Sequence, residues 1–254
     1  MPTALDLTLI GGPTAVFAYG GLRWLTDPTF SPPGPYDNLH KTTGPALAPE
    51  AIEPIDVVLL SHDEHGDNLD PAGREFLPRA ARVLTGPEGA ARLGGNATGL
   101  EPWESVEVRA ADGYAVTVTA VPALHGPEGS EAVVGPVTGF VLNGEELPTV
   151  YVSGDNASLD VVSEIAERTG PVDVAILFAG AVQIQEILDG AYLTLSSDRA
   201  AQAALILGAE TVIAMHFSDW THFTQGADQL RAAFAGHGIS PRLRIPVPGE
   251  ALAV

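Results

Sequence analysis

The apolar residues at the start of the chain follow a two-residue period. Three short runs alternate apolar and polar side chains and are separated by Gly-Gly turns: residues 5–10, 15–19 and 22–26. This period and these turns predict an antiparallel meander of strands. After a Pro- and Gly-rich loop at residues 29–49, an apolar run at residues 55–60 leads into a helical pattern at residues 69–79. A strand near Val83 and a short helix around Ala90 complete a β-then-βα order.

The second half of the chain repeats this order. Four further strands separated by Gly, Asn and Pro turns are predicted at residues 106–108, 116–121, 138–142 and 149–152. Helices then alternate with apolar strands, the helices at residues 158–168, 196–207 and 227–235 and the strands at residues 172–178, 211–215 and 243–247. This duplicated order of strands and helices is typical of two sheets packed face to face with helices on their outer faces. The sequence therefore predicts an α+β fold, a four-layer αββα sandwich, with residues 1–254 as one domain.

Side chains that can bind metals follow the ends of several predicted strands. The densest group is Ser61-His62-Asp63-Glu64-His65-Gly66-Asp67-Asn68; the others are His125, Gly154-Asp155, and His216 with His222 just beyond. Five of the seven histidines of the chain lie at these places. A rigid sheet holds residues at its strand ends, yet those residues project into loops, where α/β proteins build their sites. The pattern predicts a metal centre.

Composition narrows the chemistry of such a centre. The chain has 12 Lys and Arg against 32 Asp and Glu, a formal charge of −20, so its field disfavours nucleic acids and anionic membranes. It contains no cysteine, which leaves imidazole, carboxylate and amide oxygen as ligands. The most apolar stretch, residues 172–188, is interrupted by polar residues and is too polar to span a membrane. Residues 1–6 show no signal peptide, so a cytoplasmic protein is expected.

The order of these motifs resembles the metallo-β-lactamase superfamily, whose members are αββα metallohydrolases. Five segments carry a closer likeness to the branch of ascorbate-phosphate lactonases and N-acyl-phosphatidylethanolamine phospholipases: Leu25-Thr26-Asp27-Pro28, Val57-Val58-Leu59-Leu60-Ser61-His62, Tyr151-Val152-Ser153-Gly154-Asp155, Asp173-Val174-Ala175-Ile176-Leu177 and Ile213-Ala214-Met215-His216-Phe217. The resemblance implies one or two divalent ions, zinc before manganese or iron. It also implies that His62 and His125 serve the first ion, Asp67 and His216 the second, and that Asp155 bridges them.

The first loop departs from the family pattern His-x-His-x-Asp-His. One extra residue precedes Asp67, and Asn68 stands where the family has its last histidine. Either Glu64 or His65 replaces the missing second histidine; neutral imidazole makes His65 the closer substitute, whereas Glu64 would add charge and favour manganese or iron. Asn68 is a poor ligand for transition metals. Either Asn68 or Asp70 can be the N-cap of the next helix.

The function expected from this site is hydrolysis of a small molecule. A metal-bound hydroxide held near Asp67 and Asp155 would attack a lactone, ester, amide or phosphodiester, with His222 as a proton donor or substrate contact. The alternative is a non-hydrolytic metal-binding or redox protein on the same scaffold. No nucleic-acid partner is expected, and a homo-oligomer is a possible assembly.

Four further polar residues receive minor roles. Asp27 caps a turn or contacts the first loop, and His237 is structural at the end of a helix. His40 is a proton donor, a substrate contact or a surface residue, and its neighbour Lys41 could steer an anion.

Overall fold

Two seven-stranded sheets form the centre of the structure, a computed structural model that describes residues 5–36 and 38–254. The first sheet has the spatial order β16 (Ala251–Ala253), β1 (Asp6–Gly11), β2 (Thr14–Tyr19), β3 (Leu22–Thr26), β6 (Val57–Leu59), β7 (Arg82–Thr85) and β8 (Ala97–Gly99). The second has the order β15 (Leu243–Arg244), β14 (Thr211–Met215), β13 (Val174–Phe178), β12 (Val150–Val152), β11 (Val137–Asn143), β10 (Ala115–Ala123) and β9 (Ser105–Arg109).

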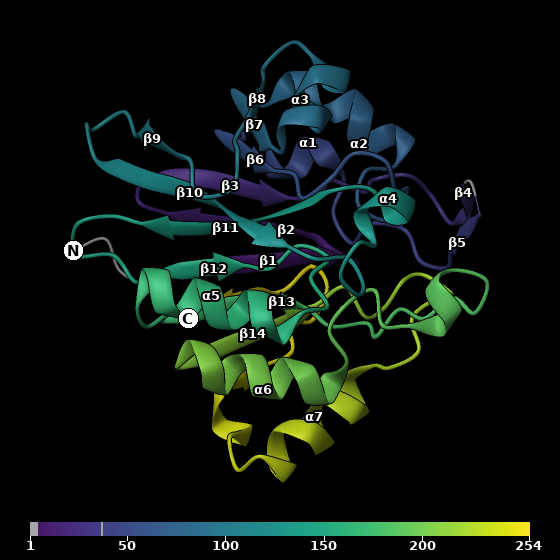
Figure 1. Cartoon of the computed structure of the whole chain (residues 1–254). Helices are drawn as coiled ribbons and strands as arrows, with labels where there is room; N and C mark the ends of the chain where they lie inside the picture. The colour runs from purple at the N-terminus through teal and green to yellow at the C-terminus, as the bar shows by residue number, and fades with distance from the viewer. Residues whose placement is uncertain (1–4, 37) are drawn as a thin grey trace.

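Helices cover the outer faces of this pair of sheets (Figure 1). The first sheet carries α1 (Pro49–Ile52), α2 (Pro71–Phe76) and α3 (Pro87–Leu93), and the second carries α5 (Leu159–Thr169), α6 (Ser197–Leu207) and α7 (Ala227–Gly236). The short helix α4 (Glu131–Val134) and the hairpin of β4 (Gly34–Tyr36) and β5 (Leu39–Lys41) lie at one end of the sandwich (Figure 1). The predicted α+β four-layer sandwich is confirmed.

Apolar side chains separate the four layers. The core between the sheets contains Phe17, Trp24, Val118, Phe140 and Ile213, all at most 1% exposed. Separate buried clusters lie under the helices on the outer faces of the two sheets. The sheets are therefore buried on both faces, which explains why the central strands read as continuous apolar runs rather than as alternating ones.

Polar caps define where the outer helices begin and end. Ser158 accepts a hydrogen bond from the Val161 N–H at the start of α5, and Ser196 accepts one from the Arg199 N–H at the start of α6. Gly208 ends α6 with a left-handed φ of 68°. These caps lie at the boundaries predicted from the sequence.

Several predicted elements have different limits. The helix expected at residues 69–79 begins later, because Asp70 is its N-cap and accepts the Gly73 N–H. It consists of α2 followed by a 3-10 turn, η1 (Leu77–Arg79). The last strand expected at residues 243–247 is only β15, and the chain then continues into β16, which pairs with β1. The loop at residues 29–49 contains the β4–β5 hairpin. The expectation of no signal peptide rests on residues 1–6, of which residues 1–4 lie outside the described residues.

Lys41 does not face an anion site. Its ammonium donates to Asp70 Oδ2 at 3.0 Å and to the Thr29 carbonyl at 2.9 Å, and both side chains are buried. Asp70 also accepts the N–H groups of Phe30 and Ser31. This buried carboxylate therefore fastens the long loop to the start of α2, and the proposed steering role of Lys41 is wrong.

The pair predicts a large stability effect. Asp70→Asn should lower the free energy of unfolding by about 3–5 kcal/mol, because it leaves the Lys41 charge buried without its partner. Urea denaturation followed by circular dichroism measures this. Glu50→Gln is the matched control, since the Arg79–Glu50 pair is exposed to solvent and should change the unfolding midpoint very little. Equal losses in the two variants would contradict a special role for Asp70.

Candidate metal centre

Strands of both sheets end at one edge of the sandwich. β3 and β6 run parallel, so Asp27 and the loop from Ser61 leave the first sheet side by side. β12, β13 and β14 are parallel, and β10 shares their direction because both β10 and β12 are antiparallel to β11. His125, Asp155 and His216 therefore emerge at a common edge, as the sequence predicts.

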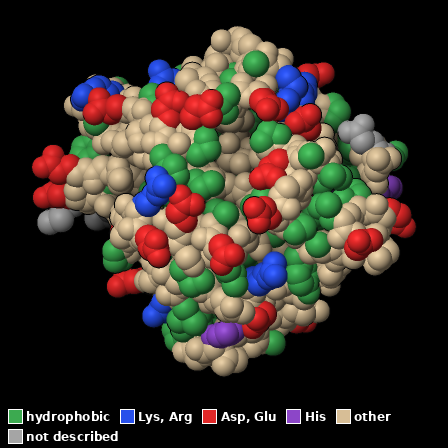
Figure 2. All heavy atoms as spheres, viewed as in Figure 1, with side chains coloured by type: hydrophobic (Ala, Val, Ile, Leu, Met, Phe, Trp, Pro, Cys, Tyr) green, Lys and Arg blue, Asp and Glu red, His purple; other side chains and the backbone are tan. Residues whose placement is uncertain are grey.

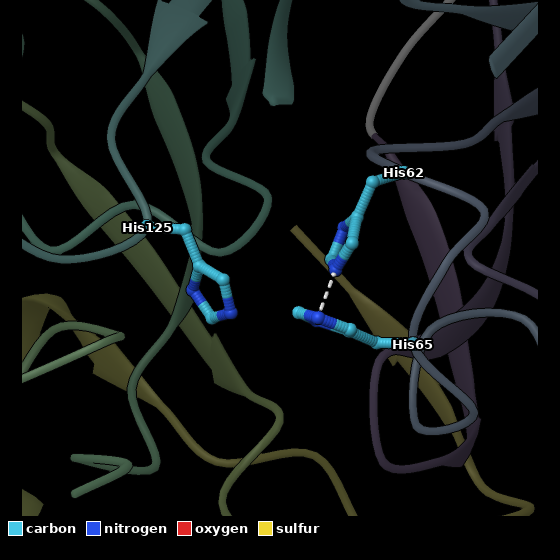
Figure 3. Close-up of side chains that lie close together, drawn as sticks. All are labelled: His62, His65 and His125. Carbon is cyan, nitrogen blue, oxygen red and sulfur yellow. Dashed lines mark hydrogen bonds between the residues drawn. The ribbon is translucent and has the colours of Figure 1, made fainter. Parts of the chain in front are cut away.

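Three imidazoles meet at this edge. His62 and His65 come from the loop after β6, and His125 faces them from the loop after β10 (Figure 3). The His62 Nε2 and His65 Nδ1 atoms are 2.9 Å apart, and the His125 ring centroid lies 5.6 Å from that of His62 and 5.2 Å from that of His65. One nitrogen from each ring lies within 4.8 Å of the others, close enough to share one ion.

The protein fixes the direction of two of these rings. The His125 Nδ1–H donates to the Leu193 carbonyl at 2.6 Å, which leaves Nε2 free to face the centre. His62 Nδ1 lies 2.9 Å from Ser61 Oγ, whose hydroxyl donates to Asp27 Oδ2 at 2.7 Å. Such partners set the tautomer and orientation of metal-binding histidines. Burial lowers the pKa values of His62 and His125, so both rings are held neutral, as ligation requires.

Asp67, Asp155 and His216 form a second group beside the first. His216 Nε2 lies 3.4 Å from Asp67 Oδ2 and 3.3 Å from Asp155 Oδ1, and all three side chains are buried. Burial would lower the pKa of His216, but the two carboxylates outweigh it and raise that pKa to about 10. Burial alone would raise the pKa values of Asp67 and Asp155, yet His216 holds both below their usual range.

Both groups fit divalent ions. Among the described residues, neither ring nitrogen of His216 has a well-aligned hydrogen-bond partner, although the carboxylates of Asp67 and Asp155 lie beside the ring. The negative charge of Asp67 and Asp155 favours a proton on His216, and it favours a cation between the two carboxylates for the same reason. A divalent ion bound there would displace the His216 proton. His125 Nε2 lies 3.9 Å from Asp155 Oδ2, so Asp155 is the carboxylate placed between the groups.

The backbone brings the two sheets together at this point. Gly154 has a φ of 55°, and a Cβ atom there would lie 2.9 Å from both Ser61 Cβ and the Thr138 carbonyl oxygen. Only glycine lets the Asp155 loop pass this close to the Ser61 loop. His216 has a φ of 55° as well, and its N–H donates to the Gly12 carbonyl at 3.0 Å. A left-handed histidine is strained, and such strain collects at functional sites.

Comparison with known proteins agrees with this arrangement. A family model described as the β-lactamase superfamily domain matches residues 23–217. This chain belongs to the β-lactamase superfamily. A relative from Pelotomaculum thermopropionicum, called a UPF0173 metal-dependent hydrolase, is 31% identical over 83% of this chain and 88% of its own length.

Two solved structures share the superfamily fold. The isothiocyanate hydrolase from Delia radicum gut bacteria has a TM-score of 0.83 at 22% identity, covering 98% of each chain. A possible metal-dependent hydrolase from Veillonella parvula has a TM-score of 0.84 at 18% identity, covering 99% of this chain and 100% of the other. The superfamily resemblance found in the sequence is confirmed, while the ligand assignments stay predictions.

Glu64 and His65 have different partners in this superfamily member. Glu64 Oε2 pairs with Arg92 at 2.9 Å, whereas His65 Nδ1 lies 2.9 Å from His62 Nε2. Arg92 also holds Asp63 Oδ1 at 2.6 Å, and Arg74 donates to the Asp63 carbonyl, so Asp63 and Glu64 are tied to α2 and α3. This arrangement favours His65 as the third imidazole ligand.

Asn68 is not the cap of the helix that follows. Asp70 fills that role, while the Asn68 amide donates to Asp27 Oδ2 at 3.1 Å and lies 3.4 Å from Asp155 Oδ1. Asn68 is fully buried, and its Oδ1 has no partner among the described residues. The residue therefore stands beside the second group.

Asp27 and Ser61 are supports that the sequence only partly revealed. Asp27 accepts hydrogen bonds from the Ser61 N–H and Oγ–H and so contacts the first loop, which is one of the two roles expected for it. Burial raises the pKa of Asp27 to about 7, against the three hydrogen bonds from Ser61 and Asn68 that favour its charged form. Ser61 lies in two of the sequence segments singled out above, but neither segment assigned it a role.

His222 lies next to the second group, and the other two minor histidines do not. The His222 Nε2–H donates to Asp67 Oδ2 at 2.9 Å. His40 is exposed on β5, and His237 pairs with Asp198 at the end of α7, in the structural position expected for it.

The first prediction from this geometry separates Glu64 from His65. His65→Ala should weaken zinc binding as severely as His62→Ala, by more than about 100-fold, since each removes a ligand rather than a supporting contact. Glu64→Gln should leave zinc affinity nearly unchanged. Competition with a chromophoric chelator measures the three affinities. A loss in Glu64→Gln that matches the loss in His62→Ala would assign the metal to Glu64.

The second prediction concerns Asn68. Asn68→His should tighten a second zinc or manganese ion, because an imidazole replaces an amide that binds such metals poorly. Calorimetric titration of the wild type and the variant gives stoichiometry and affinity. Identical titrations would show that position 68 does not reach the metal despite its contact with Asp155.

Proposed function

We propose that this protein is a metal-dependent hydrolase that acts on a lactone, ester, amide or phosphodiester bond of a small molecule. One observation carries the proposal: four residues drawn from both ligand groups, His65, Asp67, His125 and Asp155, line one cavity of about 260 Å³. The names of the relatives, metal-dependent hydrolases, agree with it. None of the described helices is long and apolar enough to span a membrane.

The ligand types suggest which ions the site takes. His62, His65 and His125 would hold one ion, and three imidazoles suit zinc. Asp67, Asp155 and His216 would hold the other, and two carboxylates also suit manganese or iron. When bound, such ions activate water and neutralise the negative charge that develops on the substrate.

The chain's own residues supply orientation and a proton. Asp155 stands between the two groups, and Asp67 holds His222 at the cavity wall through the 2.9 Å contact to Nε2. We assign to His222 the delivery of a proton to the leaving group from Nδ1, the ring nitrogen that Asp67 does not bind, a task that requires a positioned acid within reach of the substrate. Ser61 and Asp27 keep His62 oriented and do not face this cavity.

A non-hydrolytic metal-binding or redox protein is the second candidate. The observation that favours it is Asn68, which puts an amide where the family has a histidine ligand and so weakens the second group. Such a protein would bind metal at the same residues and hydrolyse none of the substrate classes above.

The test combines elemental analysis with an activity panel. The zinc- or manganese-loaded protein should hydrolyse at least one of the lactones, bis-aryl phosphodiesters and acyl amides in the panel, and a chelator should abolish that activity reversibly. His222→Gln should lower kcat by about 10²- to 10⁴-fold with metal content unchanged. His237→Gln is the matched control, because His237 pairs with Asp198, does not line the cavity and should leave kcat unchanged. Full metal loading without any turnover would favour the second candidate.

A further inference from the structure

The cavity beside the ligand groups is lined by two chemically different sets of residues, which we call its ligand end and its apolar end. The ligand end consists of His65, Asp67, His125, Asp155 and His222. The apolar end consists of Val133, Val134, Val182, Ile184, Ile187 and Leu193. Val134, Val182 and Leu193 form a small buried cluster of their own, with Ile184 and Ile187 packed against it. A reacting bond held at the ligand end therefore places the rest of the substrate against hydrocarbon.

No lysine or arginine is among the described residues that line this cavity. Basic side chains of neighbouring segments are occupied elsewhere: Arg92 with Asp63 and Glu64, Lys41 with Asp70, and Arg199 with the Ala157 carbonyl. Glu64 lines the cavity as well, paired with Arg92, and acidic side chains outnumber basic ones on the face shown in Figure 2. A phosphate or carboxylate at the apolar end would lose its hydration without gaining a partner.

The size of the cavity limits the length of that substituent. Its volume of about 260 Å³ lies below the roughly 300–1,000 Å³ of pockets that hold drug-sized ligands. A larger cavity of about 510 Å³ is lined by Gln183, Gly190 and Tyr192 of the same segment that supplies Ile184 and Ile187. None of the six ligand-competent residues lines the larger cavity, so it cannot present a bond to the metal centre.

We infer that the substrate carries a short, uncharged, apolar group next to its reacting bond. The inference rests on the proposed function and narrows it: substrates with a second anionic group, such as a phosphate remote from the reacting bond, are disfavoured. The segment of Val182, Ile184 and Ile187 sets this preference, together with Val133 and Val134 of α4.

Alkyl hydroxamates test the apolar end without any turnover, since the hydroxamate group chelates metal and the alkyl tail probes the cavity. Calorimetry on the zinc-loaded protein with aceto-, butyro- and hexanohydroxamate should show about a fourfold gain in affinity per methylene until the cavity is full. The monohydroxamate of adipic acid has the same chain length as hexanohydroxamate but ends in a carboxylate. It should bind about tenfold or more weakly than hexanohydroxamate.

Two variants assign the preference to the apolar end. Ile184→Ala should reduce affinity for hexanohydroxamate and leave that for acetohydroxamate unchanged, and Ile184→Lys should favour the carboxylate-ended ligand. Zinc content and melting temperature show whether each variant is folded. Three outcomes would overturn the inference. They are an affinity that does not change with chain length, equal binding of hexanohydroxamate and the carboxylate-ended ligand, and no hydroxamate binding by the zinc-loaded wild type. Chain-length dependence without hydrolysis of any panel substrate would instead overturn the proposed function and leave only the preference of the cavity for an apolar group.

Discussion

The burial of two carboxylates beside one histidine is the constraint on which the site depends. Asp67 and Asp155 are taken out of water at the edge where the sheets meet, and His216 lies within 3.4 Å of both. Two buried negative charges require a compensating cation, because the desolvation cost is otherwise too large. The arrangement concentrates negative charge in one place. It is built with the strained backbone of His216, the close passage of Gly154 and the neutral histidines alongside.

The sequence predicted the main architecture because that architecture rests on local rules. Strand periodicity, caps such as Ser158 and Ser196, and the position of ligand-competent residues after strands are all visible in short segments. The convergence of His62, His125, Asp155 and His216 followed from parallel strand directions and from the family order. These features need no knowledge of distant contacts.

Contacts between distant segments could not be predicted in the same way. Asp70 looked like a helix cap, and it is one, but it also binds Lys41 and the backbone of residues 30 and 31. By sequence Glu64 is as ligand-competent as His65, but in the structure its carboxylate forms an ion pair with Arg92. In each case the deciding partner lies more than 25 residues away in sequence and comes from another element. Single-residue chemistry carries no information about such partners.

The pairing of β16 with β1 has a consequence for the order in which the protein can form. β16 completes the sheet on the outer side of β1, with Ala253 opposite Asp6 and the Val254 N–H donating to the Leu5 carbonyl. Contacts of such high sequence separation are slow to form. During synthesis, β1 has no neighbour on that side until β16 has been made. The growing chain thus exposes an unpaired strand edge while all the residues between β1 and β16 are synthesised, the kind of edge that invites association with other chains.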